Sequence, residues 1–285
     1  MTILQLIRQY DFSTAYCVLV PSVPGRHRAN EMHEYGYLKL RKAVIQHAVQ
    51  SQTSSPILCQ FSSIGSLNGK WLSQFLSCLD SSTARSFDPV KESDKKKSKG
   101  SSDFTSRMKI VWPSVEEVRT CVEGYAGGGA IPGRTKNLEK EFLKPLYHRW
   151  SSRNSNNEGP LKTSKHAPHI KTFVQPSSDG RAIEWMLLGS HNLSIAALGQ
   201  IQKRSKDSSE KILFVRHWEL GVFISSATFG KDVAIVPYRG GGKSYGPEVQ
   251  VPLPYDLNPT PYNNEDVTWA VDRTTFLPDR FGRIM

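Results

Sequence analysis

The sequence lacks the long apolar segments that would place it in a membrane. None of its hydrophobic runs approaches the length of about 18 residues that a transmembrane helix requires. Residues 2–10 have the pattern of a short amphipathic helix, without the basic start and the small-residue cleavage site of a signal peptide. We therefore expect a protein without a membrane partner.

Cysteine is also scarce. The four cysteines, Cys17, Cys59, Cys78 and Cys121, lie far apart, and no C-x-x-C pair occurs. This spacing argues against a zinc site. Cys17 and Cys59 lie in apolar runs that are typical of buried thiols, which favours a reducing compartment such as the cytosol or the nucleus.

Acidic residues are outnumbered by basic ones. The sequence has 37 Lys and Arg against 26 Asp and Glu, which gives a formal net charge of +11. A surface of this charge suits a polyanion, either nucleic acid or an anionic membrane. The charge alone is equally compatible with an ordinary basic protein that is soluble.

Enough apolar residues are present for a packed core, because 38% of the residues are hydrophobic and 10% are aromatic. Predicted strands and helices alternate through the first three-quarters of the chain, which indicates an α/β layered domain. We predict a mixed β-sheet flanked by helices on both faces, in a single domain over residues 1–285. Within it, residues 136–150 have the spacing of an amphipathic helix, and residues 236–285 suggest an extended, proline-rich tail.

One internal segment departs from this composition. Residues 81–106 are rich in Ser, Lys and Asp, with a lysine run at 95–99. We expect this segment to be a disordered surface insertion. The lysine run fits three roles: contact with nucleic acid phosphates, a nuclear address, or a solvated loop with neither role.

The most informative stretch covers residues 168–194. Its two apolar runs predict neighbouring strands, and alternation along the first would place His169 and Lys171 on the same side. The second run ends in a loop that can bring the Asn192 amide to the same pocket. A histidine that carries a proton, a cation and an amide donor together suit the transition state of a phosphodiester reaction. An isolated H-x-K pattern, however, is more often structural.

Two other features have both an ordinary and a functional interpretation. The loop of residues 62–66, which follows a predicted strand at 57–61, offers Ser hydroxyls and backbone N–H groups to an anion, although any turn uses Ser and Gly. Glu219 stands among apolar residues, where it is either an edge-strand residue facing water or part of a site.

The combination of an H-x-K strand with a second strand that ends in G-S-x-N resembles the C-terminal half-site of the phospholipase D superfamily. That superfamily usually continues H-x-K-x4-D, but Pro176 occupies the position of the Asp. This departure argues against a phospholipase and fits the tyrosyl-DNA phosphodiesterase branch. Further segments match that branch in the same order, so that the resemblance covers residues 5–225. These segments are residues 60–67, 113–116, 123–128 and 218–222.

The resemblance implies a role for each candidate residue. His169 matches the general acid/base, Lys171 and Asn192 match residues that hold phosphoryl oxygens, and Glu219 matches a residue that orients a nucleophilic histidine in the other half of the enzyme. The matches expected to contact DNA are Ser63, Gly65, Ser66 and Ser194. The implied reaction hydrolyses the 3′-phosphotyrosyl bond between DNA and topoisomerase I through a phospho-histidine, with no metal or other cofactor.

The nucleophilic histidine has no candidate in this chain, because no histidine other than His169 has Lys two positions later. The resemblance therefore implies a C-terminal half only, as in a fragment, a partial gene model or a truncated isoform, and we expect the chain alone to be inactive. Its expected partner is a single-stranded DNA 3′ end that carries a tyrosyl or peptide adduct, in the nucleus, and the full-length enzyme is expected to be monomeric. Two alternatives remain: a catalytically inactive module that binds single-stranded DNA and, less favoured, a phospholipase-type phosphodiesterase.

Overall fold

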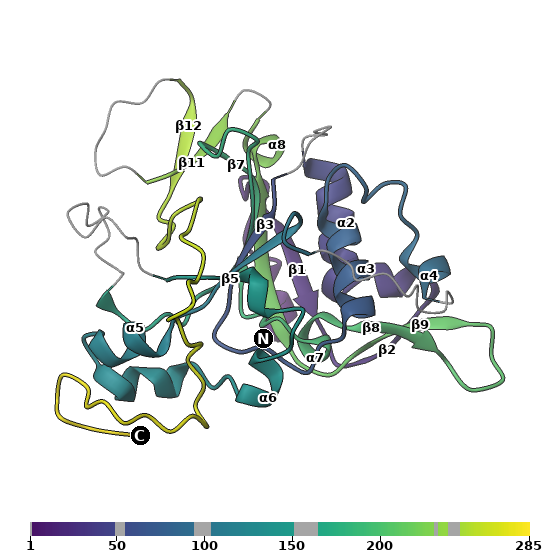
Figure 1. Cartoon of the computed structure of the whole chain (residues 1–285). Helices are drawn as coiled ribbons and strands as arrows, with labels where there is room; N and C mark the ends of the chain where they lie inside the picture. Colours follow the sequence, from purple (N-terminus) through teal and green to yellow (C-terminus); the bar gives the residue numbers. More distant parts are fainter. Residues whose placement is uncertain (1, 49–54, 94–103, 151–164, 231–232, 239–245) are drawn as a thin grey trace.

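The computed structural model describes residues 2–48, 55–93, 104–150, 165–230, 233–238 and 246–285. Within these residues, nine strands form one mixed sheet and three more form a smaller sheet (Figure 1). The nine strands of the larger sheet are β1 (Val18–Ser22), β3 (Ile57–Gln60), β4 (Met108–Val111), β5 (Tyr147–His148), β6 (Lys171–Pro176), β7 (Ile183–Gly189), β10 (Glu219–Ser225), β11 (Ala234–Pro237) and β12 (Glu248–Val251). The smaller sheet contains β2 (Gly25–Arg28), β8 (Gln200–Lys203) and β9 (Lys211–Val215).

The helices of the described residues include two of three turns or more and several short ones. The α-helices are α1 (Ile3–Ile7), α2 (Gly36–His47), α3 (Gly69–Leu79), α4 (Pro89–Glu92), α5 (Val115–Thr120), α6 (Thr135–Leu138), α7 (Ile195–Leu198) and α8 (Ser226–Phe229). The 3₁₀ helices are η1 (Ala29–Glu34), η2 (Gly124–Ala130) and η3 (Lys144–Leu146). None of the helices in the described part of the chain is long and apolar enough to cross a membrane.

The larger sheet is mixed, which confirms the predicted α/β class. Its strands lie in the order β1-β10-β7-β6-β3-β4-β5; the pairs from β1 to β3 are antiparallel, and those from β3 to β5 are parallel. This topology brings the carboxyl ends of β3 and β7 and the amino ends of β6 and β10 to one edge of the sheet. At that edge Lys171 lies opposite Gly189, which lies opposite Gly221.

The core lies on both faces of the sheet. On one face, helix α3 contributes Trp71 and Phe75, whose rings are stacked at 5.0 Å, and Phe75 packs against Phe173 of β6. On the other face, Val174 belongs to a cluster with Tyr255 of the C-terminal tail. Helices α2 and α3 lie on one side of the sheet (Figure 1), and the part of the tail that carries Tyr255 packs on the other. Both faces of β6 are thereby covered, and all six of its residues are buried.

The predicted helix at 136–150 is wrong. The segment contains α6, η3 and β5 instead, and β5 pairs with β4, Tyr147 lying opposite Ile110. Pro145 cannot donate the backbone hydrogen bond that a continuous helix would need at this position. The apolar residues that suggested a helix belong to the core instead, and Leu138, Leu143 and Leu146 are fully buried.

The predicted disorder over residues 81–106 is wrong for its two ends, and residues 94–103 lie outside the described residues. Residues 81–93 are ordered and include α4, where the Asp88 side chain caps the helix by accepting from the backbone N–H of Val90. Ala84 is fully buried and Phe104 is 4% exposed. These apolar side chains pack into the core, which the local excess of Ser and Lys did not indicate.

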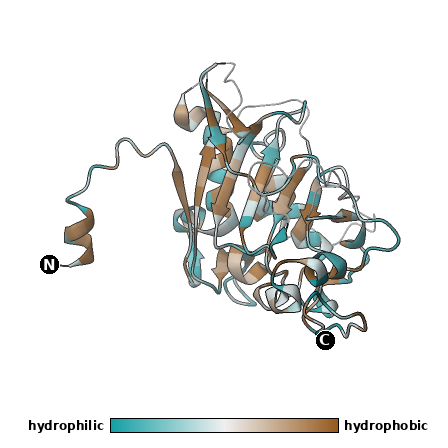
Figure 2. Ribbon diagram, turned by 90° about the vertical axis from the view of Figure 1, so that its left-hand side faces the viewer, coloured by the Kyte–Doolittle hydropathy of each residue, from teal (hydrophilic) through white to brown (hydrophobic). Residues whose placement is uncertain are grey.

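Helix α1 extends away from the rest of the chain (Figure 2). Thr2 and Gln5 form a reciprocal capping box at its amino end. Its apolar side chains contribute to no described core, since Ile3 is 77% exposed and Leu4 is 66% exposed.

The tail returns to the body of the domain at Trp269, whose side chain is 1% exposed. The Trp269 indole N–H lies 3.2 Å from the carbonyl oxygens of Gly128 and Ile131 in the glycine-rich segment. A Cβ at position 128 would lie 1.9 Å from Cζ2 of Trp269, whereas a Cβ at Gly129 would meet nothing within 4 Å. Glycine at 128 therefore allows the indole to approach the backbone of η2.

We expect Gly128→Ala to lower the free energy of unfolding by about 1–3 kcal/mol, because the added methyl group overpacks the Trp269 site. Gly129→Ala is the matched control, and its effect should stay within about 0.5 kcal/mol, as for surface substitutions. Urea unfolding of the two variants measures both values. Equal stability of the two variants would contradict this account of the tail.

Candidate active site

The loops that follow β3 and β7 are tied together by the side chain of Asn192. Its Oδ1 accepts hydrogen bonds from the backbone N–H of Ser63 at 3.0 Å and from the backbone N–H and hydroxyl of Ser62, both at 3.3 Å. The backbone N–H of Gly65 also donates to the carbonyl of Leu193 at 2.9 Å. Because Oδ1 accepts from the loop, the Asn192 Nδ2 remains as a donor that bonds no other described residue.

His169 and Lys171 meet at the neighbouring end of β6. The strand begins at Lys171, so His169 precedes it, contrary to the prediction that both lie in the strand. The Lys171 Nζ donates to the His169 carbonyl at 2.6 Å and lies 3.3 Å from the His169 Nε2. His169 is exposed, whereas Lys171 is 8% exposed. The edge therefore presents an accessible imidazole against a largely buried cation.

Burial lowers the pKa of both groups, whereas the neighbouring charges act on the two pKa values in opposite directions. Desolvation lowers the pKa of His169 below 6.5, and the neighbouring Lys171 charge lowers it further. Burial lowers the pKa of Lys171, while the Glu219 carboxylate opposes that shift. His169 is thus predominantly neutral at pH 7, the form that accepts a proton. An anion bound between the two groups would favour their protonated forms.

Glu219 begins β10 at the same edge. It lies two residues before Gly221, which occupies the row of Lys171 and Gly189, so Glu219 points to the same face as Gly221. Its side chain is 12% exposed, and one carboxylate oxygen lies 4.0 Å from Nδ1 of His217. Glu219 therefore lies at the predicted site, rather than facing water as an ordinary edge-strand glutamate would.

The four residues predicted to contact DNA lie in the joined loops. Ser63 donates its backbone N–H to Asn192, as described above. Gly65 lies against Ser194, because a Cβ at Gly65 would be 2.6 Å from the Ser194 Cβ. The Ser194 hydroxyl caps α7 by accepting from the backbone N–H of Ala197 at 3.0 Å. Ser66 is exposed farther along the loop.

Sequence reasoning missed a cation beside this loop. The Lys140 Nζ lies 3.5 Å from the Ser66 hydroxyl and donates to the carbonyl of Leu67 at 2.5 Å. Lys140 lies in the segment that was wrongly predicted as a continuous helix, and no motif surrounds it. Only the tertiary packing of the α6 region against the β3 loop brings this charge to the site.

Sequence reasoning also assigned no role to His191. Its side chain is 1% exposed, and neither ring nitrogen has a hydrogen-bond partner among the described residues. The ring packs under β10, since a Cβ at Gly221 would lie 3.3 Å from its Cε1 and Nδ1. Desolvation lowers the pKa of His191 to about 4. A neutral imidazole therefore underlies the active-site edge.

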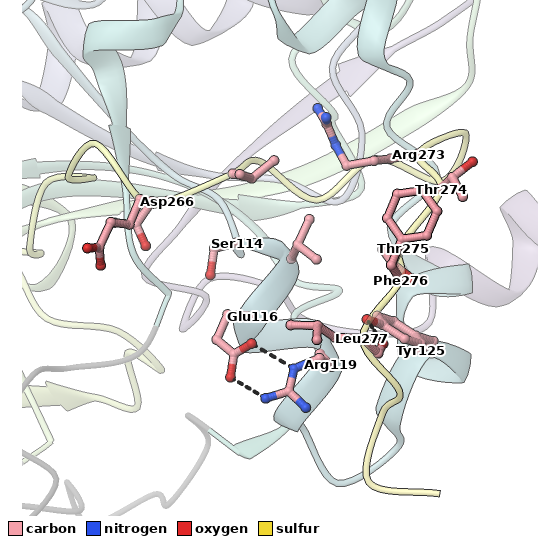
Figure 3. Close-up of a pocket in the computed structure, with 13 residues that line it drawn as sticks. Ser114, Glu116, Arg119, Tyr125, Asp266, Arg273, Thr274, Thr275, Phe276 and Leu277 are labelled. Atoms are coloured by element: carbon pink, nitrogen blue, oxygen red, sulfur yellow. Dashed lines mark hydrogen bonds and ion pairs between the residues drawn. The ribbon is translucent and has the colours of Figure 1, made fainter. Parts of the chain in front are cut away.

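A separate cavity of about 420 Å³ lies between α5 and the C-terminal tail (Figure 3). It contains none of the predicted site residues. Arg119 links its two walls, pairing with Glu116 at 2.6 Å and donating to the carbonyl of Pro278 at 3.0 Å. We interpret this cavity as the seam where the tail packs on α5. No cluster of three or more His, Cys, Asp or Glu able to hold a metal occurs in the described residues.

The fold and the arrangement at this edge define a protein of the phospholipase D superfamily. The model of the tyrosyl-DNA phosphodiesterase family matches residues 1–263. The chain therefore belongs to the tyrosyl-DNA phosphodiesterase family.

Individual relatives agree with this assignment. The chain is 34% identical to tyrosyl-DNA phosphodiesterase 1 of Arabidopsis thaliana, covering 97% of this chain and 46% of that protein. It is 30% identical to tyrosyl-DNA phosphodiesterase 1 of Drosophila melanogaster, covering 93% of this chain and 43% of that protein. The chain thus spans less than half the length of these relatives. A crystal structure of yeast tyrosyl-DNA phosphodiesterase matches the fold with a TM-score of 0.60 and 17% identity, over 94% of this chain and 60% of that chain.

The buried His191 predicts a pH dependence of stability. Its pKa is about 4 in the folded state against the ordinary 6.5, so the unfolded chain binds the additional proton between these values. Stability should fall as the pH decreases from 6.5 to about 4. The free energy of unfolding should decrease between pH 7 and pH 5, and we expect His191→Asn to make this decrease smaller by about 2 kcal/mol. Urea unfolding at pH 7 and pH 5 measures the difference.

The exposed His217 provides a matched control, since His217→Asn removes a histidine from the same edge without removing a buried one. That variant should keep the pH dependence of the original chain. If His191→Asn and His217→Asn lose stability equally between pH 7 and pH 5, the assignment of the acid sensitivity to His191 is wrong.

Proposed function

We propose that this chain supplies one half of a two-part site that hydrolyses the phosphodiester bond between a DNA 3′ end and a tyrosine. The observation that carries the proposal is the contact between His169 and Lys171 at the edge where Asn192 presents its amide donor. Family membership supports the choice of DNA as substrate, as does the net charge of +11. The complementary half would be the family's N-terminal half, and the proposal includes a nuclear location, where this DNA lies.

In the proposed reaction, a histidine of the complementary half attacks the 3′ phosphorus. The bond from phosphorus to the tyrosyl oxygen breaks, and protonated His169 gives its proton to that oxygen. The neutral His169 then takes a proton from water, whose oxygen attacks the phospho-histidine and releases a 3′ phosphate and the histidine. Lys171 and the Asn192 Nδ2 would hold the phosphoryl oxygens through both steps. No step of this scheme uses a cofactor.

An exposed apolar face on the larger sheet supports the proposal that a second, complementary half binds this chain. Leu19, Val222 and Leu188 form one row across β1, β10 and β7, and they are 55%, 39% and 45% exposed. Leu220, on β10 next to Pro21, is 54% exposed. Contiguous apolar surface of this kind is typical of a protein interface. Leu220 and Val222 alternate with Glu219 and Gly221 along β10, so this face lies on the side of the strand opposite to Glu219.

A catalytically inactive module that binds single-stranded DNA is the second candidate. The joined Ser and Gly loops and the basic charge favour it, because they require no nucleophile. A phospholipase is less favoured, since Pro176 ends β6 where the superfamily has Asp.

The chain alone should hydrolyse a 3′-phosphotyrosyl oligonucleotide negligibly, and mixing it with the family's N-terminal half should restore cleavage. In the mixture, we expect His169→Ala to slow the reaction by roughly 100- to 10,000-fold, because it removes the general acid/base. A covalent DNA adduct on the N-terminal half should accumulate. Lys171→Ala should slow both steps and leave no such adduct. Rapid quenching followed by denaturing gel electrophoresis measures rate and adduct together.

With a leaving group that needs no proton, such as a nitrophenol, the first step of the His169→Ala mixture should regain the original rate. His33→Ala, a histidine of η1 whose charged neighbours are Glu34, Arg41, Lys42 and Asp88 rather than residues of this edge, is the control and should retain the original rate. Full activity of the unassisted chain would refute the half-site. A folded His169→Ala mixture that is slow with both leaving groups and forms no adduct would refute the role of His169.

A further inference from the structure

The outer face of the smaller sheet gathers arginine side chains around one aromatic ring. Arg26 lies opposite Phe214 in the register of β2 and β9. The Cζ atoms of Arg26 and Arg216 lie 5.6 Å and 5.3 Å from the centroid of the Phe214 ring. Arg28 follows Arg26 by two residues and so points to the same face. Both guanidinium groups thus lie against the same ring, at an energetic gain that is modest at exposed sites.

These arginines have no acidic partner among the described residues. Arg26, Arg28 and Arg216 are exposed and form no ion pair with a carboxylate there. The neighbouring acids face elsewhere: Glu210 pairs with Arg204 at 2.9 Å, and Glu31 lies 3.9 Å from His27 on the opposite face of β2. Like charges held on one ring repel each other, and a bound polyanion would relieve that repulsion.

The arginine face is connected to the catalytic edge by a short, fixed segment. The backbone N–H groups of Arg216 and His217 donate to the carbonyl of Ala196 at 3.0 and 3.1 Å, in the helix that follows Asn192. Trp218 comes next and is 74% exposed, and Glu219 then begins β10. The chain therefore passes from the arginine face, through an exposed indole, directly to the active site. Figure 1 shows β2, β8 and β9 at the same end of the larger sheet as α7.

We propose that this face, formed by Arg26, Arg28, Phe214, Arg216 and Trp218, binds the single-stranded part of the DNA outside the catalytic edge. The arginines would contact phosphates, and a base would stack on Trp218, which is the combination that sequence-independent binding of single strands uses. The inference rests on the proposed function only for the choice of DNA. The face itself requires no 3′ end and no chemistry.

The test measures the affinity of the full chain for circular single-stranded DNA, which has no 3′ end and cannot occupy the catalytic edge as a substrate. We expect the double variant Arg26→Glu/Arg216→Glu to bind at least about tenfold more weakly than the original chain, because two phosphate contacts are lost and two carboxylates repel the DNA. The slope of log K against log salt should fall by about 1.4, or 0.7 for each lost contact. Arg181→Glu, in the exposed turn between β6 and β7, carries the same charge change as a control and should bind within about twofold of the original.

Trp218 provides a second readout that does not depend on charge. It is the exposed tryptophan of the six in the chain, the other five being at most 5% exposed. Bound DNA should quench its fluorescence, and Trp218→Leu should abolish the quenching and weaken binding. Oligonucleotides of about 4 and about 16 nucleotides, which bracket the site size of one binding domain, should differ, with the longer one bound more tightly.

Equal affinities of the Arg26→Glu/Arg216→Glu and Arg181→Glu variants, both folded by circular dichroism, would overturn the inference. So would tighter binding to acidic polypeptide or to anionic vesicles than to DNA at the same salt concentration. Loss of circular-DNA binding only in the arginine variant supports the face, even if the chain mixed with the N-terminal half proves inactive.

Discussion

The candidate active-site edge depends on the hydrogen bonds that the Asn192 side chain accepts from the loop after β3. These bonds join two loops that are 130 residues apart in sequence and fix the amide so that its nitrogen remains available as a donor. An amide held in this way loses little conformational entropy when it binds a phosphoryl group. The same contact explains the close approach of Gly65 to Ser194, where a larger residue would separate the loops.

A second constraint is the row of Lys171, Gly189 and Gly221 across three strands. A Cβ at Gly189 would lie 2.6 Å from the Cα of Gly221, so the strands lie close together at this point. The missing side chains leave space beneath the edge for the buried ring of His191. The neutral ring of His191 therefore lies beneath the edge that carries Lys171, whose charge is little screened because the side chain is largely buried. The carboxylate of Glu219, on the neighbouring strand β10, is the negative charge that acts on Lys171.

Much of this site was predictable from the residues because it lies on two strands with clear hydrophobic patterns. Both strands of the stretch at 168–194 are present, and His169 contacts Lys171 as expected, although His169 lies just before the strand rather than in it. The register between β6 and β7 was not predictable, since it depends on an irregularity at Gln175 and Pro176. Lys140 and the arginine face were missed because packing between distant segments creates them. The helix predicted at 136–150 failed where pairing with β4 outweighed local periodicity.

The most direct test asks whether the edge of this chain binds a phosphoryl group by itself. The account predicts that a short 3′-phosphorylated oligonucleotide, followed by NMR, raises the pKa of His169 and shifts the side-chain N–H signals of Asn192 with one common Kd, and that Lys171→Ala weakens both effects. An anion beside a histidine favours its protonated form, which fixes the direction of the change. An unchanged titration of His169 at saturating oligonucleotide, with shifts confined to other residues, would contradict the central claim.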